Sequence, residues 1–245
     1  IAARLRGSMP GAGPVAPGGE APAYLNGLNP EQREAVETTE GPVLVLAGAG
    51  TGKTRAITHR IAYGVHSGVY QPQRVLAVTF TARAAGEMRD RLRTMGVAGV
   101  QAQTFHAAAR RQLKYFWPQV AGDLPWQLLD NKFPLVARAV RSVGLDNSKD
   151  MIRDVLAEIE WAKSALVSAE DYESVIATTD RSAPADPAKV AEAFRRYEQS
   201  KATPDMMHLD FDDLLMHIAG AIENVPAIAE TFREQYRTFV VDEYQ

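Results

Sequence analysis

The sequence has no cysteine among its 245 residues, which excludes disulfide bonds and thiolate metal sites. It has no run of apolar residues long enough to cross a membrane, and its N-terminus lacks the apolar core of a secretory signal. No internal repeat is visible. The apolar fraction of 46% is ordinary for a globular protein, and the length fits one large domain or two small ones. These features lead us to expect a cytoplasmic globular protein with no membrane partner.

Positive charge is unevenly spread along the chain. The net charge of −3 by itself argues nothing for a nucleic-acid partner. From residue 55 to residue 115, however, ten Lys or Arg residues stand against only Glu87 and Asp90, so this stretch carries +8 and the remainder −11. Such an asymmetry is expected of a surface that faces an anionic partner, or of solvated helix faces balanced by acids from elsewhere. Charge alone leaves both possibilities open.

A glycine-rich loop lies between a predicted strand and a predicted helix. The loop reads Ala47-Gly48-Ala49-Gly50-Thr51-Gly52-Lys53-Thr54 and is followed by Arg55. Its glycines let successive backbone N–H groups point at one anion, and the helix N-terminus adds a partial positive charge. This is the context of a phosphate-binding loop, in which Lys53 reaches the β- and γ-phosphates and the Thr54 hydroxyl is a ligand of Mg²⁺. Ala47 replaces the usual first glycine, and a plain glycine-rich turn is the alternative.

Four short apolar runs predict buried strands, and helices lie between the first three. This alternation is typical of an α/β fold whose parallel sheet is covered by helices on both faces. Each run is followed by a polar motif at its C-terminal end, where open α/β sheets place their ligands. The runs are residues 43–46, 75–79, 100–104 and 238–241.

The middle of the chain has a different pattern. It lacks strand–helix alternation, contains all three tryptophans, and predicts helices over 149–166, 169–177 and 187–200. We therefore predict an all-helical subdomain inserted into the sheet domain, with the tryptophans helping to fill its core. The expected boundaries are a disordered Gly/Pro/Ala-rich tail at 1–23, the first part of the sheet domain at 24–107, the insertion at 108–204 and the second part at 205–245.

The last apolar run ends in two acids, Asp242 and Glu243. In phosphoryl transfer, catalysis is mainly positioning and charge stabilisation, so two carboxylates at one strand end suit the task. Asp242 would hold Mg²⁺ through water, and Glu243 would polarise the attacking water. An acidic pair after a strand is weak evidence alone, but together with Lys53 and Thr54 it predicts an ATP site.

With these motifs the chain resembles the superfamily 1 DNA helicases of the UvrD/PcrA/Rep type, over roughly residues 25–245. Residues 28–36 are similar to the Q motif, whose glutamine contacts adenine, and residues 47–54 to motif I, where alanine at the first position is common. Gln32 thus has two interpretations, an adenine contact or the capping box that Asn29 begins, and the resemblance favours the first. It implies a RecA-like P-loop fold with ATP and Mg²⁺ as cofactors. The predicted nucleotide-binding residues are Gln32, Ala47, Gly48, Ala49, Gly50, Thr51, Gly52, Lys53, Thr54 and Arg55, with Lys53 and Glu243 catalytic and Thr54 and Asp242 at the metal.

Two further strand ends resemble the family's DNA-contacting motifs: residues 78–88 are similar to motif Ia and residues 103–107 to motif Ib. The family usually has Asn and Lys where Ala82 and Arg83 stand, so the positive charge is kept but one side-chain contact is put in doubt. A buried core histidine is the alternative for His106, and a core aromatic is the alternative for Phe80, which otherwise suits base stacking. The acids of residues 209–215, also typical of the family, are expected to position the fold. The predicted DNA-binding residues are Thr79, Phe80, Thr81, Arg83, Thr104 and His106.

The resemblance implies an ATP-driven 3′→5′ helicase or translocase that acts on single-stranded and duplex-junction DNA in repair or replication. Residues 58–64, 111–117 and 158–163 are most similar to the second UvrD-type helicase of actinobacteria. The family's remaining motifs, second motor domain and arginine fingers are expected after Gln245, so we expect this part alone to be almost inactive and to need that C-terminal half as its partner. Competing classes are a P-loop kinase and a non-catalytic DNA-binding module with a P-loop.

Overall fold

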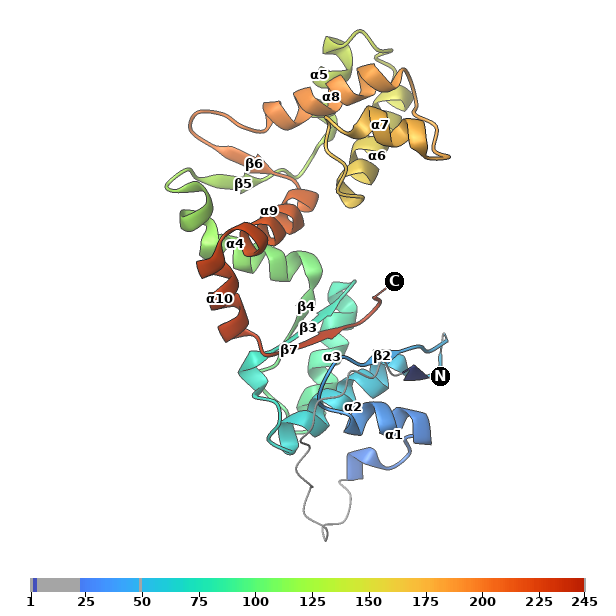
Figure 1. Ribbon diagram of the computed structural model, residues 1–245, viewed down its shortest axis with the longest axis vertical. Helices are drawn as coiled ribbons and strands as arrows, with labels where there is room; N and C mark the ends of the chain where they lie inside the picture. Colours follow the sequence, from blue (N-terminus) through green and yellow to red (C-terminus); the bar gives the residue numbers. More distant parts are fainter. Residues whose placement is uncertain (1, 4–22, 49, 245) are drawn as a thin grey trace. The chain divides into compact units, whose positions relative to one another are not determined.

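The structure is a computed structural model that describes residues 2–3, 23–48 and 50–244 (Figure 1). The chain divides into two compact units, which we describe separately: unit 1 is Ile1–Ala108 with Val225–Gln245, and unit 2 is Ala109–Asn224. Unit 2 thus extends twenty residues past the predicted end of the insertion at 204. The disordered tail predicted over 1–23 lies outside the described residues, apart from residues 2, 3 and 23.

Unit 1 is built on a parallel sheet of three strands in the order β4-β3-β7. The strands are β3 (Val75–Thr79), β4 (Gln101–Thr104) and β7 (Thr238–Val241), which match three of the four predicted strands. Thr79 pairs with Thr104, and Val78 pairs with Val241. Because the strands are parallel and in this register, their C-terminal ends lie at one edge of the sheet. The polar motifs that follow them therefore meet at that edge.

The side chains of β3 alternate between two cores, as a strand buried on both faces requires. Val75 and Ala77 pack into a cluster with residues of α2 (Lys53–His66) and α3 (Ala82–Thr94), including Ile61 and Met88. On the opposite face, Leu76 and Val78 pack with residues of α4 (Phe105–Ala121) and α10 (Pro226–Gln235) and with Tyr236, which follows α10. Helices therefore cover both faces, as the strand–helix alternation predicted.

The fourth predicted strand, 43–46, does not join this sheet. Only Leu44–Val45 is extended, as β2, and it pairs antiparallel with β1 (Ala2–Ala3). Leu44 and Leu46 are 44% and 52% exposed, so the prediction of a buried strand here is wrong. An apolar run predicts that a strand forms, but its burial depends on which strand edge and which helices lie beside it, and the run itself does not encode these.

The helices of unit 1 follow their capping signals. Asn29 and Gln32 form the predicted capping box at the start of α1, and Thr81 caps α3 by accepting from the Ala84 N–H. The α-helices are α1 (Pro30–Glu37), α2 (Lys53–His66), α3 (Ala82–Thr94) and α10 (Pro226–Gln235), with two 3₁₀ turns, η1 (Ala23–Leu25) and η2 (Pro72–Arg74). The helix α4 (Phe105–Ala121) begins in unit 1 and continues into unit 2.

Unit 2 is mainly helical, with α5 (Phe133–Ser142), α6 (Lys149–Ser164), α7 (Tyr172–Thr178), α8 (Pro187–Ser200) and α9 (Phe211–Asn224). Its core is a cluster that includes the fully buried Tyr172 and Tyr197, with Trp161 packed at its border. Trp117 and Trp126 contact each other elsewhere in the unit. Among the described residues, no helix is both long and apolar enough to span a membrane.

The inserted unit is not all-helical as predicted. A parallel pair of short strands, β5 (Trp126–Leu128) and β6 (Met207–Leu209), links its first and last parts. Three-residue strands carry too little alternation to be detected from sequence. The pairing also explains why unit 2 extends to residue 224, because β6 leads directly into α9.

Candidate active site

The glycine-rich loop turns sharply into α2. Gly52 is the N-cap of α2 at φ +86°, and Gly50 has φ +76°, both in the left-handed region that favours glycine. A Cβ on Gly52 would lie 2.8 Å from Nε2 of Gln32, so a larger residue would also displace the Gln32 amide. Thr51 closes the turn by donating from Oγ1 to the Gly48 carbonyl at 2.8 Å. The predicted loop member Ala49 lies outside the described residues.

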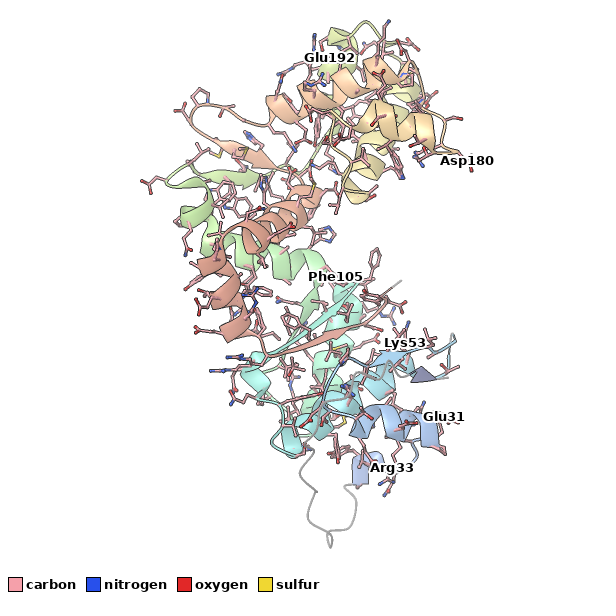
Figure 2. The ribbon with its side chains drawn as sticks, viewed as in Figure 1. Glu31, Arg33, Lys53, Phe105, Asp180 and Glu192 are labelled. Atoms are coloured by element: carbon pink, nitrogen blue, oxygen red, sulfur yellow. The ribbon has the colours of Figure 1, made fainter. Side chains whose placement is uncertain are left out.

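Lys53, the first residue of α2, contacts the acidic end of β7. Its Nζ lies 2.8 Å from Oε1 of Glu243, although the two residues are 190 positions apart in sequence. Both side chains are partly exposed, Lys53 at 24% and Glu243 at 43%. Thr54 follows in the first turn of the helix, and Lys53, Thr54 and Glu243 all line one cavity beside the loop. The structure therefore brings together the two residues that the sequence predicts to be catalytic (Lys53 is labelled in Figure 2).

Asp242 is buried beside this pair. The residue is only 4% exposed, and its Oδ1 receives no hydrogen bond from the described residues. Burial raises the pKa of this carboxyl; Lys53 lowers it and Glu243 raises it further, and the net direction is upward. Its backbone N–H donates to the Val78 carbonyl, which fixes it at the edge of the sheet. A buried carboxylate oxygen without a partner is costly, and a cation is the group that would relieve that cost.

Glu243 has an unusual backbone conformation. Its φ is +59°, and among the described residues only one other non-glycine residue, Leu166, has a positive φ. A side chain at positive φ is strained, and such strain is concentrated at functional sites. The turn directs the Glu243 carboxylate to Lys53 while Asp242 remains buried behind it. The sequence gives no signal of this strain.

Gln32 contacts the loop as well as its own helix. Its Oε1 accepts from the Asn29 N–H at 3.2 Å, and its Nε2 donates to the Thr51 carbonyl at 2.9 Å. The helix cap, one of the two interpretations of this residue, is therefore present. Gln32 also lines a cavity of about 280 Å³ with Asn29, Leu46 and Lys53, and its role in adenine contact stays a prediction.

A larger cavity of about 800 Å³ adjoins the loop and contains two residues that the sequence analysis missed. Four predicted site residues line it, namely Lys53, Thr54, Arg55 and Glu243, but so do His59 and Arg91. Burial lowers the pKa of His59, with Arg55 and Arg91 adding to that effect, although its hydrogen bond with the Arg55 carbonyl opposes it. His59 lies within the resembling stretch 58–64, so it could have been considered, whereas nothing in the sequence around Arg91 indicates that α3 would bring it here.

The predicted DNA-binding residues divide into two groups. Thr79, Thr81 and Thr104 use their hydroxyls locally: Thr79 donates to the Thr81 carbonyl, and the other two accept from backbone N–H groups at helix starts. Phe80 is 77% exposed at the end of β3, and the Arg83 side chain is 89% exposed although it pairs with Glu87. His106 is half-buried in the first turn of α4. Phe80 and Arg83 are thus exposed to solvent, whereas the threonines shape the turns beside them.

Unit 2 holds a second group of paired charges, in which the acids of residues 209–215 take part. Lys163 of α6 contacts Asp210 at 2.7 Å and Asp213 at 2.5 Å, and Lys201 contacts the same two acids. Burial acts to lower the pKa of Lys163, but Glu198, Asp210 and Asp213 outweigh it and the pKa is raised. Glu198, Asp210 and Asp213 are spaced closely enough to hold a metal ion, but the ammonium groups of Lys163 and Lys201 already pair with all three.

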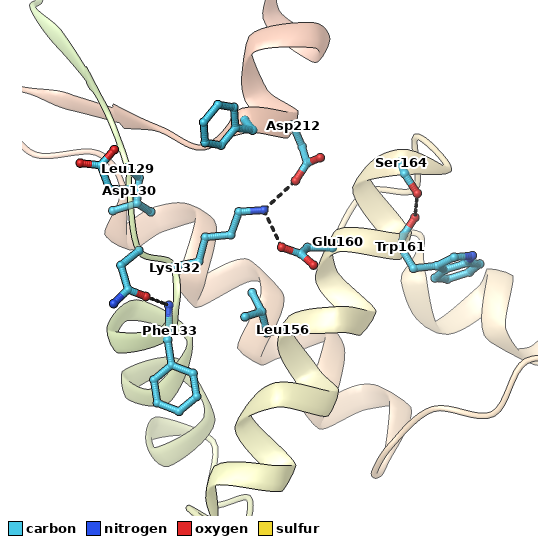
Figure 3. Close-up of a pocket in the computed structure, with 11 residues that line it drawn as sticks. Leu129, Asp130, Lys132, Phe133, Leu156, Glu160, Trp161, Ser164 and Asp212 are labelled. Atoms are coloured by element: carbon cyan, nitrogen blue, oxygen red, sulfur yellow. Dashed lines mark hydrogen bonds and ion pairs between the residues drawn. The ribbon is translucent and has the colours of Figure 1, made fainter. Parts of the chain in front are cut away.

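Unit 2 also contains a cavity of about 750 Å³ that no sequence motif predicts (Figure 3). Lys132 crosses it between Glu160, at 2.9 Å, and Asp212, at 2.8 Å. Burial acts to lower the pKa of Lys132, but the hydrogen bonds to Asp212 and Glu160 raise it overall. Leu156 and Trp161 supply apolar lining. The three charged groups at its centre, Lys132, Glu160 and Asp212, thus pair with one another.

Comparisons with known proteins agree with this geometry. The UvrD/REP helicase N-terminal domain family matches residues 28–245. Over 230 residues the chain is 56% identical to "ATP-dependent DNA helicase UvrD2" of Mycobacterium tuberculosis and of Mycobacterium bovis, covering 90% of the chain and 33% of each relative. It is 34% identical to "ATP-dependent DNA helicase PcrA" of Bacillus subtilis, covering 90% of the chain and 30% of that protein. The chain therefore spans about a third of the length of these relatives.

Proposed function

We propose a function from one premise: the chain belongs to the UvrD/REP helicase N-terminal domain family. The full-length protein hydrolyses ATP to move along single-stranded DNA and to separate duplexes in DNA repair or replication. Its relatives at 56% and 34% identity carry the name ATP-dependent DNA helicase. The chain covers about a third of the length of these relatives. The observation that carries the proposal is the convergence of Lys53, Asp242 and Glu243 at one loop.

The loop and α2 bind the phosphates of ATP. The N-terminus of the fourteen-residue α2 and the Lys53 ammonium present positive charge to the β- and γ-phosphates. Contact with phosphate draws Lys53 from Glu243, and the Glu243 carboxylate then orients water and accepts its proton. Positioning and charge stabilisation of this kind supply most of the catalysis in phosphoryl transfer.

The donors at this site fit Mg²⁺. Asp242 offers a buried carboxylate oxygen without a hydrogen-bond partner among the described residues, and Thr54 offers a hydroxyl at the start of α2. Mg²⁺ prefers oxygen ligands and usually keeps several waters beside one or two protein groups. When bound, it neutralises developing phosphate charge. The backbone of Asp242 is held by its hydrogen bond to the Val78 carbonyl, which keeps the residue at the edge of the sheet.

The strand ends at the same edge of the sheet contact single-stranded DNA. Phe80 offers an exposed ring on which a base stacks, and Arg83 offers a guanidinium for the phosphate backbone. His106 adds a contact at the start of α4. The +8 charge of residues 55–115 supports this assignment, because backbone binding is dominated by phosphate neutralisation.

The test is steady-state ATP hydrolysis by the full-length protein with and without single-stranded DNA. We expect DNA to stimulate hydrolysis, and Glu243→Gln to reduce it by roughly 10²-fold or more while ATP still binds. Glu40→Gln, at an exposed glutamate outside the site, is the matched control and should hydrolyse normally. Hydrolysis that DNA does not stimulate would favour a P-loop kinase, and absence of hydrolysis in the wild type would favour a non-catalytic binding module.

A further inference from the structure

Helix α1 carries Gln32 near its N-terminus, and a residue of α2 binds its C-terminal end. Arg60 of α2 donates from Nη1 to the Ala35 carbonyl at 2.8 Å and also to the Thr38 carbonyl. These carbonyls belong to the last turn and C-cap of α1, where carbonyls lack partners within the helix. A cation at a helix C-terminus also interacts favourably with the helix dipole. Arg60 therefore acts as a C-terminal cap delivered from a neighbouring helix.

Tyr70 supports this contact from the loop after α2. Its hydroxyl donates to the Thr39 carbonyl at 2.8 Å and lies beside the Arg60 guanidinium. The ring is buried against α2 at Gly64, where a Cβ would lie 2.1 Å from Cδ2 of Tyr70. Arg60 and Gly64 are four residues apart and so share one face of α2. We call Arg60, Gly64 and Tyr70 the α1 clamp.

The other end of α1 meets the phosphate loop. Gln32 donates to the Thr51 carbonyl at 2.9 Å, next to Gly52 and Lys53. The helix has only eight residues, a length at which helices are not stable in isolation. Its direction therefore depends on its tertiary contacts, namely Gln32 at one end, the clamp at the other, and the buried Ala35 and Val36 between them. The exposed Arg33 of α1 takes no part in the clamp (Figure 2).

Gln32 is suited to read a purine base if its orientation is fixed. A glutamine amide offers one donor and one acceptor group, the pair that matches N7 and N6 of adenine. The cavity that Gln32 lines, about 280 Å³, lies directly beside the loop residues Gly48 and Lys53. A small rotation of α1 would move the amide relative to these loop residues and weaken its hydrogen bond to the Thr51 carbonyl.

We propose that Arg60, supported by Tyr70, is a positioning residue for the nucleotide site: it sets the helix that carries Gln32 against the phosphate loop and so controls recognition of the base. The inference rests on the proposed function. The clamp touches neither phosphate nor metal residues, so its loss affects binding of the nucleotide more than the chemical step. Loss of uniform binding raises KM and leaves kcat nearly unchanged.

The experiment is a double-mutant cycle between Arg60→Ala and Gln32→Ala in the full-length protein. KM and kcat are measured for ATP and GTP in DNA-stimulated hydrolysis, with Tm as a record of folding. We expect Arg60→Ala to raise KM for ATP by roughly fivefold to thirtyfold, to leave kcat within about twofold, and to reduce the preference for ATP over GTP. In the Gln32→Ala background, Arg60→Ala should have little further effect, because both changes remove the same contact.

Two milder variants and one control complete the design. Tyr70→Phe keeps the ring and removes only the hydroxyl, so it should raise KM by about twofold to fivefold, and Arg60→Lys should recover part of the wild-type KM. These variants keep the test decisive if Arg60→Ala does not fold. Arg33→Ala, at an exposed arginine paired with Glu37, should match the wild type.

Two outcomes would overturn the inference while the proposed function stands: an unchanged KM in Arg60→Ala and Tyr70→Phe, or an Arg60→Ala effect that is equally large in the Gln32→Ala background. A wild-type protein without DNA-stimulated hydrolysis would instead overturn the proposed function, and this inference with it.

Discussion

Lysine–carboxylate pairs of nearly equal length occur in both units and differ in their surroundings. Lys53 and Glu243 of unit 1 lie 2.8 Å apart with both side chains partly exposed, whereas Lys163 and Asp210 of unit 2 lie 2.7 Å apart and are almost completely buried. All four carboxylate oxygens of Asp210 and Asp213 accept hydrogen bonds. Beside Lys53, by contrast, the buried Oδ1 of Asp242 accepts none from the described residues.

The two groups of charges differ in how completely their hydrogen bonds are satisfied, and this distinguishes a charged group that stabilises the fold from one that is suited to bind a ligand. The unit 2 network joins α6, α8 and the start of α9, and its donors and acceptors satisfy one another. The nucleotide-loop site combines an acceptor without a partner, a strained Glu243 and an open cavity. Ion pairing alone therefore does not identify a functional site; the unpaired oxygen of Asp242 and the strain at Glu243, found together beside a cavity, favour one here.

The largest effect on stability should come from breaking the buried network. Lys163→Ala leaves the buried carboxylates of Asp210 and Asp213 with one ammonium instead of two, and removing one partner of a buried pair costs about 3–5 kcal/mol. We expect the free energy of unfolding, measured by urea denaturation, to fall by that amount. Lys149→Ala, at an exposed lysine on the same helix, should change little. Equal stability of the two variants would show that the network is not structural.

The next effect separates catalysis from folding. Lys53→Ala should reduce DNA-stimulated ATP hydrolysis by roughly 10²–10³-fold or more, because it removes a cation from the transferred phosphoryl group. The Tm should hardly change, since the Lys53–Glu243 pair is partly exposed and such pairs contribute little to stability. Hydrolysis near the wild-type rate would refute the assignment of the loop.

Asp242→Asn should change stability and activity in opposite directions. Replacing a buried carboxylate that has an unsatisfied oxygen should raise the free energy of unfolding by about 1–2 kcal/mol, while hydrolysis falls by roughly 10²-fold. The pKa of Asp242 is raised on folding, so the wild type gains stability from this group below its unfolded pKa and loses it as pH rises through the folded pKa. The stabilisation by Asp242→Asn should therefore be larger at pH 7 than at pH 4. A destabilised variant at pH 7 would contradict this account.

The network of unit 2 should respond to pH with the opposite sign. Burial raises the pKa of Asp210, but Lys201 and Lys163 outweigh it and the pKa is lowered overall. Its contribution is therefore complete above its unfolded pKa, about 4, and is lost as pH falls toward the folded value. Tyr197→Phe, which removes a hydroxyl that donates to Asp210 at 2.7 Å, should cost about 1 kcal/mol. Urea denaturation from pH 3 to pH 7 tests both expectations, and a stability that does not fall toward pH 3 would argue against them.

The smallest effect concerns charges that are paired but fully exposed. Arg83→Glu should weaken binding of single-stranded DNA severalfold and reduce the salt dependence of log K by about one phosphate contact. The Tm should not change, because the Arg83–Glu87 pair is exposed. Arg153→Glu, at an exposed arginine of α6, is the control. If binding does not depend on salt and Arg83→Glu binds as well as the control, the end of β3 does not contact DNA.

The sequence predicted the parts of the structure whose signals are local. The loop at Lys53, the acidic end of β7 and the capping box of Gln32 each occupy a few consecutive residues with a known conformational reason. Three of the four strands followed from apolar runs, and the three helices predicted in the middle of the chain overlap α6, α7 and α8. The predicted helix 187–200 agrees with α8, whose cap is Asp186.

What escaped prediction depends on distant partners. Lys163 and Asp210 are 47 positions apart, and no pattern in either segment indicates that they meet. The exposure of Leu44 and the pairing of β5 with β6 depend on which strand edges lie together. Arg91 reaches the nucleotide-loop cavity through the packing of α3, and the positive φ of Glu243 is a property of the folded turn. Such features are decided by tertiary contacts.

One measurement tests most directly the contrast between the Asp242 site of unit 1 and the buried network of unit 2. It is the shift in Tm that Mg²⁺ with a non-hydrolysable ATP analogue produces. A ligand that binds only the folded protein stabilises it, by about 2.7 kcal/mol at one hundred times Kd. We predict a clear upward shift in the wild type, almost none in Asp242→Asn although its starting Tm is higher, and a normal shift in Tyr197→Phe although its starting Tm is lower. A full shift in Asp242→Asn, or loss of the shift in Tyr197→Phe, would contradict the account.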